Sequence, residues 1–335
     1  MNLEVIILAA GQGTRMKSPL PKVLHPVAGR PMLQHVVETA RALQAKAIHV
    51  VVGHGAEQVR AALDDPGLTW VTQEQQLGTG HAVLQAMPAV QPDSTVLILY
   101  GDVPLISAST LENLVAVAVS APALLTAKVA NPAGYGRILR DEAGALVGVV
   151  EHKDASDSQL LIDEINSGVL AAPASDLQQY LPAIKNQNSQ GEYYLPDVLA
   201  MAVADGKAVA SCMAESELEI QGVNDRVQLH QVEREFQRLQ AEQLMRAGVS
   251  LADGSRLDVR GVLHCGVDVS IDVNVVLEGA VTLGDGVSIG PNCILRDVTV
   301  GEGAIIHAMS HLQEAEVGAA CSVGPYARLR PGTVL

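Results

Sequence analysis

The stretch VIILAAGQGTRMK, residues 5–17, decides the fold of the chain. Its first six residues are apolar, which is typical of a strand that is buried on both faces of a parallel sheet. The strand runs directly into a turn that contains Gly11 and Gly13. Because ligands of open α/β sheets bind outside the carboxyl ends of the strands, the stretch predicts an α/β fold with a ligand site at this turn.

Further short aliphatic runs alternate with helical patterns up to about residue 225. The expected strands lie at residues 5–10, 48–52, 68–72, 96–100, 124–129, 146–150, 168–172 and 209–213. The expected helices lie at residues 32–45, 57–63, 80–87, 110–120, 177–184 and 198–204. Such alternation is typical of right-handed crossovers between parallel strands. It therefore predicts a doubly wound, mostly parallel sheet.

The pattern changes in residues 225–247, which predict one long helix with Asn224 and Asp225 as its cap. An apolar stripe runs along this helix among Glu, Gln and Arg residues. The stripe consists of Val232, Phe236, Leu239 and Met245.

Beyond Gly248 the helix signals vanish, and aliphatic residues recur at steps of six with occasional steps of five. Gly, Asp and Asn punctuate the intervals. This hexapeptide period is typical of a β-helix, in which each coil needs a neighbour above and below. The positions in register are Ile271, Leu277, Leu283, Ile289, Leu295, Val300, Ile306, Leu312, Val317, Val323, Leu329 and Leu335.

These patterns divide the chain into an α/β domain at residues 1–226, a linker helix at 227–247 and a β-helix at 248–335. The repeat stops at Leu335 in mid-pattern, whereas a solenoid normally ends in an atypical capping unit. We therefore expect the chain to be truncated within the β-helix.

Composition excludes several classes of protein. The 335 residues are 48% hydrophobic and 18% charged, so a large core can form and the chain is not mainly disordered. A net charge of −15 and 2% aromatic residues argue against partners such as nucleic acid or an anionic membrane. The four cysteines form no C-x-x-C pair. With no signal peptide and no stretch near the ~18 apolar residues of a membrane span, we expect a cytoplasmic protein without membrane insertion.

The turn after the first strand has the features of a phosphate-binding loop. Small residues at positions 9–11 and 13 let main-chain N–H groups approach a phosphate, and a following helix would add its positive end. Arg15 and Lys22 supply mobile positive charge. Met16 replaces the third glycine of a dinucleotide fingerprint, and no Walker sequence occurs. Residues 1–30 carry a net charge of +3 against −18 elsewhere, so a polyanion is attracted here.

Asp102 is the candidate metal ligand. It follows the apolar run that ends in Tyr100 and Gly101, so its carboxylate is expected at the ligand edge of the sheet. One carboxylate together with water and phosphate oxygens is the usual way in which Mg²⁺ is held. By itself, however, an Asp at this position is more often an ordinary turn residue.

Seven motifs together resemble those of sugar-nucleotide pyrophosphorylases. With the hexapeptide tail, they closely resemble the bacterial bifunctional family of N-acetylglucosamine-1-phosphate uridylyltransferases and glucosamine-1-phosphate acetyltransferases. The resemblance covers essentially the whole chain. The motifs are LAAGQGTRM at 8–16 with Pro21-Lys22, QLGTGHA at 76–82, YGDVPL at 100–105, GYGRI at 134–138, VEHKDA at 150–155, EINSG at 164–168 and GVN at 222–224.

The resemblance implies a role for each matching residue. The nucleotide would be held by Leu8, Ala9, Ala10, Gly11, Gln73, Gly78 and Thr79, with Lys22 and Arg15 on its phosphates. Mg²⁺ would be bound by Asp102 and Asn224, beside Tyr100 and Gly101. The N-acetylglucosamine moiety would contact Gly136, Glu151 and Asn166. Arg330 matches a phosphate contact of the second activity. The roles of His25, His81, Tyr193 and Tyr194 stay open.

The resemblance also implies the fold and the reaction. It implies a Rossmann-like nucleotide-diphospho-sugar transferase domain and a left-handed β-helix that forms a homotrimer. The reaction is Mg²⁺-dependent uridylyl transfer from UTP to N-acetylglucosamine 1-phosphate, which yields UDP-N-acetylglucosamine, a precursor of peptidoglycan and lipopolysaccharide, and pyrophosphate. Acetyl transfer from acetyl-CoA is expected only in the full-length enzyme. Alternatives are a pyrophosphorylase for another sugar or nucleotide, and a non-catalytic hexapeptide scaffold.

Overall fold

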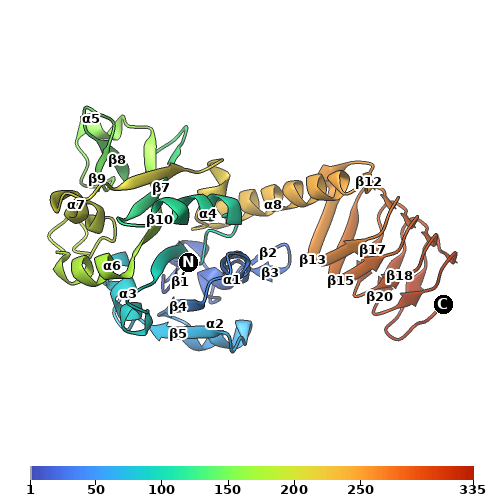
Figure 1. Ribbon diagram of the computed structural model, residues 1–335. Helices are drawn as coiled ribbons and strands as arrows, with labels where there is room; N and C mark the ends of the chain where they lie inside the picture. Colours follow the sequence, from blue (N-terminus) through green and yellow to red (C-terminus); the bar gives the residue numbers. More distant parts are fainter. Residues whose placement is uncertain (1) are drawn as a thin grey trace. The chain divides into compact units, whose positions relative to one another are not determined.

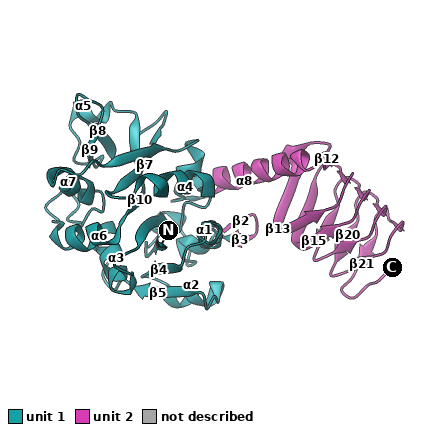
Figure 2. Cartoon of the chain, in the orientation of Figure 1, with its two compact units in different colours: residues 1–25, 31–228 teal, residues 26–30, 229–335 magenta. Residues whose placement is uncertain are grey.

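The computed structural model describes residues 2–335, which form two compact units (Figure 2). Unit 1 comprises the chain up to His25 together with Pro31–Gln228, and unit 2 comprises Pro26–Arg30 together with Leu229–Leu335. Within the described residues, no helix has the length and apolarity that crossing a membrane requires.

Unit 1 is built on a nine-stranded sheet whose central strands are parallel (Figure 1). Strand β1 pairs in parallel with β4 and β6, whereas β10 runs antiparallel to both β6 and β7. The order is β11-β7-β10-β6-β1-β4-β5, with β8 and β9 paired beside β10. The strands are β1 (Leu3–Ala9), β4 (Ala47–Val52), β5 (Leu68–Thr72), β6 (Thr95–Tyr100), β7 (Ala123–Lys128), β8 (Arg137–Arg140), β9 (Leu146–Val150), β10 (Glu164–Pro173) and β11 (Ala210–Met213).

Helices cover both faces of this sheet, which confirms the predicted α/β architecture. Val5 and Ile7 of β1 pack in one hydrophobic core, and Ile6 and Leu8 pack in the other. The first core is closed by α1 (Met32–Ala42), α2 (Ala56–Leu63) and α4 (Ala108–Val117). The second is closed by α3 (Thr79–Ala86), α6 (Ala174–Tyr180) and α7 (Asp197–Ala204). The single turn α5 (Asp157–Leu160) follows β9.

The region around β10 differs from the sequence-based expectation. A strand is predicted only at residues 168–172, but β10 begins at Glu164 and so includes Asn166. Its pairing with β7 shifts register between Asn166 and Leu170, which interrupts the alternation of side chains that prediction relies on. The strand β8, which pairs with β9 and β10, is not predicted either, because its two apolar residues stand between charged ones.

The long helix α8 (Arg226–Arg246) begins behind Asp225. The carboxylate of Asp225 accepts hydrogen bonds from the main-chain N–H groups of Val227 and Gln228, both 2.9 Å long. This cap agrees with the predicted one.

The predicted apolar stripe of α8 is correct for Val232, which is buried, and wrong for its C-terminal half. Leu239 and Met245 are exposed, and the buried residues are Val232, Gln237 and Ala241. Gln237 can be buried because its amide donates to the Val259 carbonyl and accepts from the Val259 N–H, at 2.8 and 2.9 Å. A buried polar residue with satisfied hydrogen bonds lies on the packed face, which an apolar pattern does not reveal.

Unit 2 winds into a β-helix in which all strand pairings from β12 onward are parallel. One sheet has the order β12-β14-β16-β19-β22, and the other has the order β21-β18-β15-β17-β20-β23 with β13 beside β15. The strands are β12 (Ser250–Leu251), β13 (Leu257–Cys265), β14 (Ser270–Ile271), β15 (Val275–Leu283), β16 (Ser288–Ile289), β17 (Ile294–Arg296), β18 (Thr299–Val300), β19 (Ile305–Ile306), β20 (His311–Gln313), β21 (Glu316–Val317), β22 (Ser322–Val323) and β23 (Arg328–Leu329). A separate pair is formed by β2 (Pro26–Val27) and β3 (Arg30–Pro31).

The coils follow the predicted period. Leu277 pairs with Leu295, three steps of six along the chain, and Leu295 pairs with Leu312, where one step of five intervenes. The predicted positions from Ile271 to Val323 are buried in one core. Leu329 packs against this core but is only partly buried, and Leu335 is 52% exposed.

One coil contact depends on glycine. Gly279 has φ +68°, and a Cβ there would lie 2.1 Å from Oδ1 of Asp297. The same oxygen accepts the N–H of Ala280 at 2.9 Å. Gly303 has nearly the same φ of +66°, but a Cβ there would meet nothing within 4 Å.

These two glycines provide a matched stability test. Both Gly303→Ala and Gly279→Ala place a side chain in the left-handed region, at a cost of roughly 1–2 kcal/mol each. Gly279→Ala also displaces Asp297 from Ala280, so we expect it to lower the free energy of unfolding by about 2 kcal/mol more. Urea unfolding followed by circular dichroism measures the difference. Equal losses in the two variants would contradict this account.

Candidate active site

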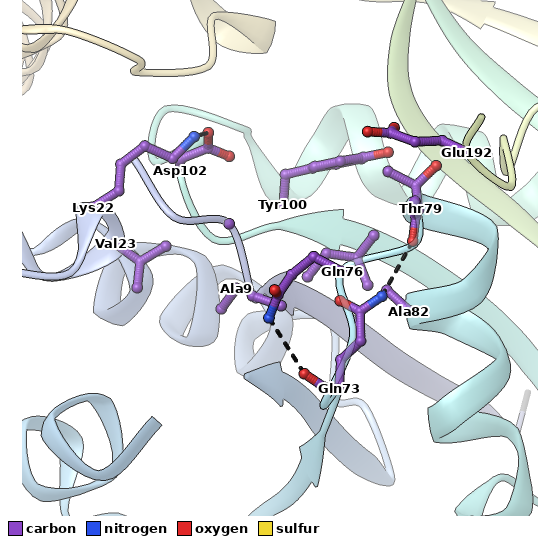
Figure 3. A pocket seen from close by; sticks show the side chains of 14 residues that line it. Ala9, Lys22, Val23, Gln73, Gln76, Thr79, Ala82, Tyr100, Asp102 and Glu192 are labelled. Atoms are coloured by element: carbon purple, nitrogen blue, oxygen red, sulfur yellow. Dashed lines mark hydrogen bonds and ion pairs between the residues drawn. The ribbon is translucent and has the colours of Figure 1, made fainter. Parts of the chain in front are cut away.

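A pocket of about 220 Å³ opens at the carboxyl ends of β1, β5 and β6 (Figure 3). Its lining includes ten of the residues predicted from the sequence: Leu8, Ala9, Ala10, Gly11, Lys22, Gln73, Gly78, Thr79, Tyr100 and Asp102. Gly101 is not part of the lining, and a Cβ there would come within 3.1 Å of the Leu33 side chain. The parallel strands thus bring together segments that lie far apart in the sequence.

The loop after β1 leaves main-chain donors unused. Among the described residues, no hydrogen bond is made by the N–H groups of Gly11, Gln12 or Gly13. Beside Gly11 the space is open, because a Cβ there would meet nothing within 4 Å. Consecutive free N–H groups next to open space are suited to binding an anion.

The helix expected after this loop is absent. The loop continues as a 3-10 turn, η1 (Thr14–Met16), in which Met16 is buried and anchors the segment. A second 3-10 turn, η2 (Lys22–Leu24), follows, and α1 starts only at Met32. The prediction of a helix dipole at this site is therefore wrong, because Pro19 and Pro21 prevent the turn from continuing as a helix.

Lys22 lies between two oxygen ligands. Its ammonium group forms an ion pair with Oδ2 of Asp102 and donates a hydrogen bond to Oδ1 of Asn224 at 3.2 Å. The main chain holds these residues in place, since the N–H of Val223 donates to the Asp102 carbonyl at 2.9 Å. Both charged side chains are about 15% exposed, so the pair is well shielded from water.

Tyr100 lies in the middle of the site, between Asp102 and Thr79 (Figure 3). Burial is the main cause that raises the pKa of Tyr100, and the negative charges of Asp102 and Glu151 add to it. The phenol therefore stays protonated and can act as a hydrogen-bond donor. Gly168 packs on its ring, where a Cβ would lie 2.7 Å from Cε2.

The predicted sugar-binding residues form a second group beyond Tyr100. The N–H of Asn166 donates to the Gly136 carbonyl at 2.9 Å, and Oδ1 of Asn166 accepts from the N–H of Gly168 at 2.8 Å. A Cβ on Gly136 would lie 3.2 Å from Oε1 of Glu151. The structure thus brings Gly136, Glu151 and Asn166 together beside Tyr100.

Glu151 is surrounded by acidic groups. Burial raises its pKa, and the neighbouring charges of Asp154, Asp197 and Glu192 raise it further. It also lines a cavity of about 400 Å³, together with Asp154, Tyr194 and Asp197. Carboxylates held this close are costly to ionise, and perturbed acids of this kind cluster at functional sites.

Seven predicted residues do not line this pocket: Arg15, Gly101, Gly136, Glu151, Asn166, Asn224 and Arg330. Two of the seven are exposed. Arg15 is exposed on η1, and Arg330 is exposed after β23 in unit 2. Four lining residues are missing from the sequence-based assignment: Val23, Gln76, Ala82 and Glu192. Gln76 and Ala82 lie inside the QLGTGHA motif, and Val23 follows Lys22. In the sequence, only this nearness to assigned residues indicates that the three line the pocket.

His25 is buried, and its pKa is lowered by burial and by the charge of Arg226. The structure therefore places it as a neutral packing residue. Tyr193 has a main-chain role, because its N–H donates to Leu77 and its carbonyl accepts from Gly80, both at 2.8 Å. Tyr194 accepts a hydrogen bond from Gln190 at 2.8 Å.

Comparisons with known proteins show the fold and the family of the chain. Residues 5–161 match the family described as MobA-like NTP transferase domain. A solved nucleotidyl transferase from Methanothermobacter thermautotroptrophicus has a similar fold, with a TM-score of 0.51 and 23% identity, covering 71% of this chain and 98% of that one.

Two curated relatives are much more similar in sequence. The bifunctional protein GlmU of Marinobacter nauticus is 57% identical over 99% of this chain and 74% of its own length. The bifunctional protein GlmU of Pseudomonas entomophila is 55% identical over 100% of this chain and 74% of its own length. On this identity and coverage, the chain belongs to the GlmU family and is a nucleotidyltransferase.

Proposed function

We propose that the chain catalyses uridylyl transfer from UTP to N-acetylglucosamine 1-phosphate, with formation of UDP-N-acetylglucosamine and pyrophosphate. The observation that carries the proposal is the arrangement of Lys22, Asp102 and Asn224 beside the unused N–H groups of Gly11–Gly13. Positive charge, main-chain donors and two oxygen ligands for a cation meet at one edge of one pocket. This is the set of groups that phosphoryl transfer requires.

Asp102 and Asn224 fit a hard divalent cation. Their side-chain oxygens already converge on one cation, the ammonium group of Lys22. Among the described residues, no group of three or more His, Cys, Asp or Glu could hold a metal ion. Two protein oxygens completed by water and phosphate are nevertheless typical of Mg²⁺. When bound, Mg²⁺ would neutralise negative charge on the phosphates.

Lys22 has two competing sets of partners. Without substrate, its ammonium group neutralises Asp102. Phosphate oxygens in the pocket compete for the same group, and Lys22 turns toward them as they arrive. Asp102 and Asn224 then become free for the cation, so nucleotide and metal binding support each other.

The reaction needs positioning more than proton transfer. A phosphate oxygen of the sugar phosphate attacks the α-phosphorus of UTP in line with the leaving pyrophosphate. The attacking oxygen is already an anion, so no general base is required. Lys22 and the N–H groups of Gly11–Gly13 stabilise the charge of the transferring group, and Asn166 and Glu151 hold the sugar.

Product formation tests the proposal directly. UTP and N-acetylglucosamine 1-phosphate should give pyrophosphate in the presence of Mg²⁺, and EDTA should abolish its release. Parallel assays with other nucleotides and hexose phosphates separate this reaction from that of another pyrophosphorylase. A chain that binds the substrates but releases no pyrophosphate would be a binding scaffold instead.

Lys22→Ala removes the cation that faces both Asp102 and the phosphates. We expect turnover to fall by roughly 10²–10³-fold, the loss typical of one preorganised charge-stabilising donor. Asp102→Asn, measured at saturating Mg²⁺, should cause a comparable loss. Lys17→Ala, an exposed residue of the same loop, is the matched control and should retain turnover. Near-normal turnover of Lys22→Ala would refute the role assigned to Lys22.

Glu151→Gln tests the cost of the acidic cluster. The ionised Glu151 is disfavoured by burial and by Asp154, Asp197 and Glu192, so the neutral variant should unfold about 2 °C higher at neutral pH. Wild-type Glu151 gains a proton as the pH falls through its raised pKa, and the advantage of the variant should then shrink. Thermal unfolding between pH 4.5 and pH 8 measures this trend, and the turnover of the variant should be lower throughout.

A further inference from the structure

Gln73 is a buried amide that borders the nucleotide pocket. It follows β5 and is 3% exposed. Its Nε2 lies 3.2 Å from the Gly78 carbonyl oxygen (Figure 3). A carbonyl oxygen only accepts hydrogen bonds, so the amide atom beside it has to be the nitrogen.

The same nitrogen determines the state of His81. Nε2 of Gln73 is 3.0 Å from Nδ1 of His81. Since one amide N–H is directed at Gly78, the second is directed at His81, and Nδ1 must accept it. The ring is then neutral with its proton on Nε2, which lies 3.3 Å from the side-chain amide of Gln85. The amide atom of Gln85 nearest to this nitrogen is Nε2, which is itself a donor. A 180° turn of the Gln85 amide brings its oxygen there to accept the ring proton, one helical turn along α3.

Tyr193 holds both acceptors in place. Its main chain is hydrogen-bonded to Leu77 and Gly80, on either side of Gly78. Gly78 has φ +114°, and a Cβ there would lie 2.6 Å from the Tyr193 carbonyl oxygen. The ring of His81 packs beside that of Tyr193, with centroids 6.3 Å apart. Neither acceptor can therefore move easily away from Gln73.

The oxygen of Gln73 is left for a ligand. Both N–H groups of the amide are used within the protein, and among the described residues no donor contacts Oε1. A flipped amide would place Oε1 against the carbonyl oxygen of Gly78 and the lone pair of Nδ1. The contact with Gly78 is repulsive in either tautomer of His81, and the contact with Nδ1 is repulsive when the ring proton is on Nε2, so in that tautomer the flipped amide loses both hydrogen bonds.

We propose that His81 is a positioning residue that sets the choice of pyrimidine base by holding Oε1 of Gln73 toward the pocket. Uracil has an N–H at position 3, which can donate to this oxygen. Cytosine has a lone pair at the same position, which the oxygen repels. The inference rests on the proposed binding of UTP in this pocket and adds the residue that orients the base contact.

Three substitutions at His81 separate hydrogen bonding from packing. In His81→Asn, the amide oxygen takes the place of Nδ1 as acceptor. In His81→Gln, an acceptor lies near the position of Nε2. His81→Phe keeps only a ring beside Tyr193. The readout is the ratio of kcat/KM for UTP to kcat/KM for CTP. Binding of UDP and CDP by calorimetry provides the same ratio without catalysis.

We expect His81→Phe and His81→Gln to lower the ratio about tenfold, the effect of losing roughly one hydrogen bond. His81→Asn should stay within about twofold of wild type. If the ring matters only for packing, Phe will keep the ratio and Asn will lose it, which overturns the proposal. If wild type itself binds UDP and CDP equally, the base contact proposed for Gln73 is wrong. If wild type prefers uridine but releases no pyrophosphate, the proposed reaction fails and the role of His81 stands.

Discussion

The burial of β1 on both faces is the constraint on which the site depends. Val5, Ile6 and Ile7 have no exposed surface, because β1 lies in the middle of the sheet with a helical layer on either side. No polar group can lie along such a strand without losing its hydration. Binding groups are therefore confined to the point where the strand ends. There the chain leaves the sheet as a glycine turn with free N–H groups, and β5 and β6 end at the same edge.

Charge at that edge is arranged for an anion in a protein that is otherwise acidic. The net charge of the chain is −15, yet the pocket holds Lys22 in a shielded position. A buried ammonium without a partner is unstable, and Asp102 supplies that partner in the absence of ligand. In the proposed mechanism, the same carboxylate binds a cation when phosphates compete for Lys22. The ion pair thus balances the charge of Lys22, and in the proposed mechanism it couples nucleotide binding to cation binding.

The sequence predicts well the part of the site at the ends of β1 and β6, and it predicts poorly the part that β10 contributes. The strand before Gly11 and the strand before Asp102 are short apolar runs, and topology places their ends together without further information. Asn166 is different, because it precedes a register shift in β10, where the alternation of side chains breaks. Gln237 shows the same limit in α8, since its burial depends on two hydrogen bonds to Val259 that no hydrophobic pattern encodes. The roles assigned to Asn166, Glu151 and Asn224 come from resemblance, and the structure adds that these residues lie at the site.

Buried polar side chains away from the pocket differ from those at the pocket in how many of their hydrogen-bonding atoms have a partner within the protein. Glu4 is 1% exposed, and its two oxygens contact His49 at 2.8 Å and the N–H of Gln91 at 3.0 Å. Glu164 is likewise held by two hydrogen bonds from Arg140, which lower its pKa. Around the pocket the pattern changes, because Gln73 uses its nitrogen within the protein and leaves its oxygen without a partner in the described chain. An amide whose orientation is fixed on one side and unused on the other is preorganised, so a ligand that matches it has no reorientation to overcome.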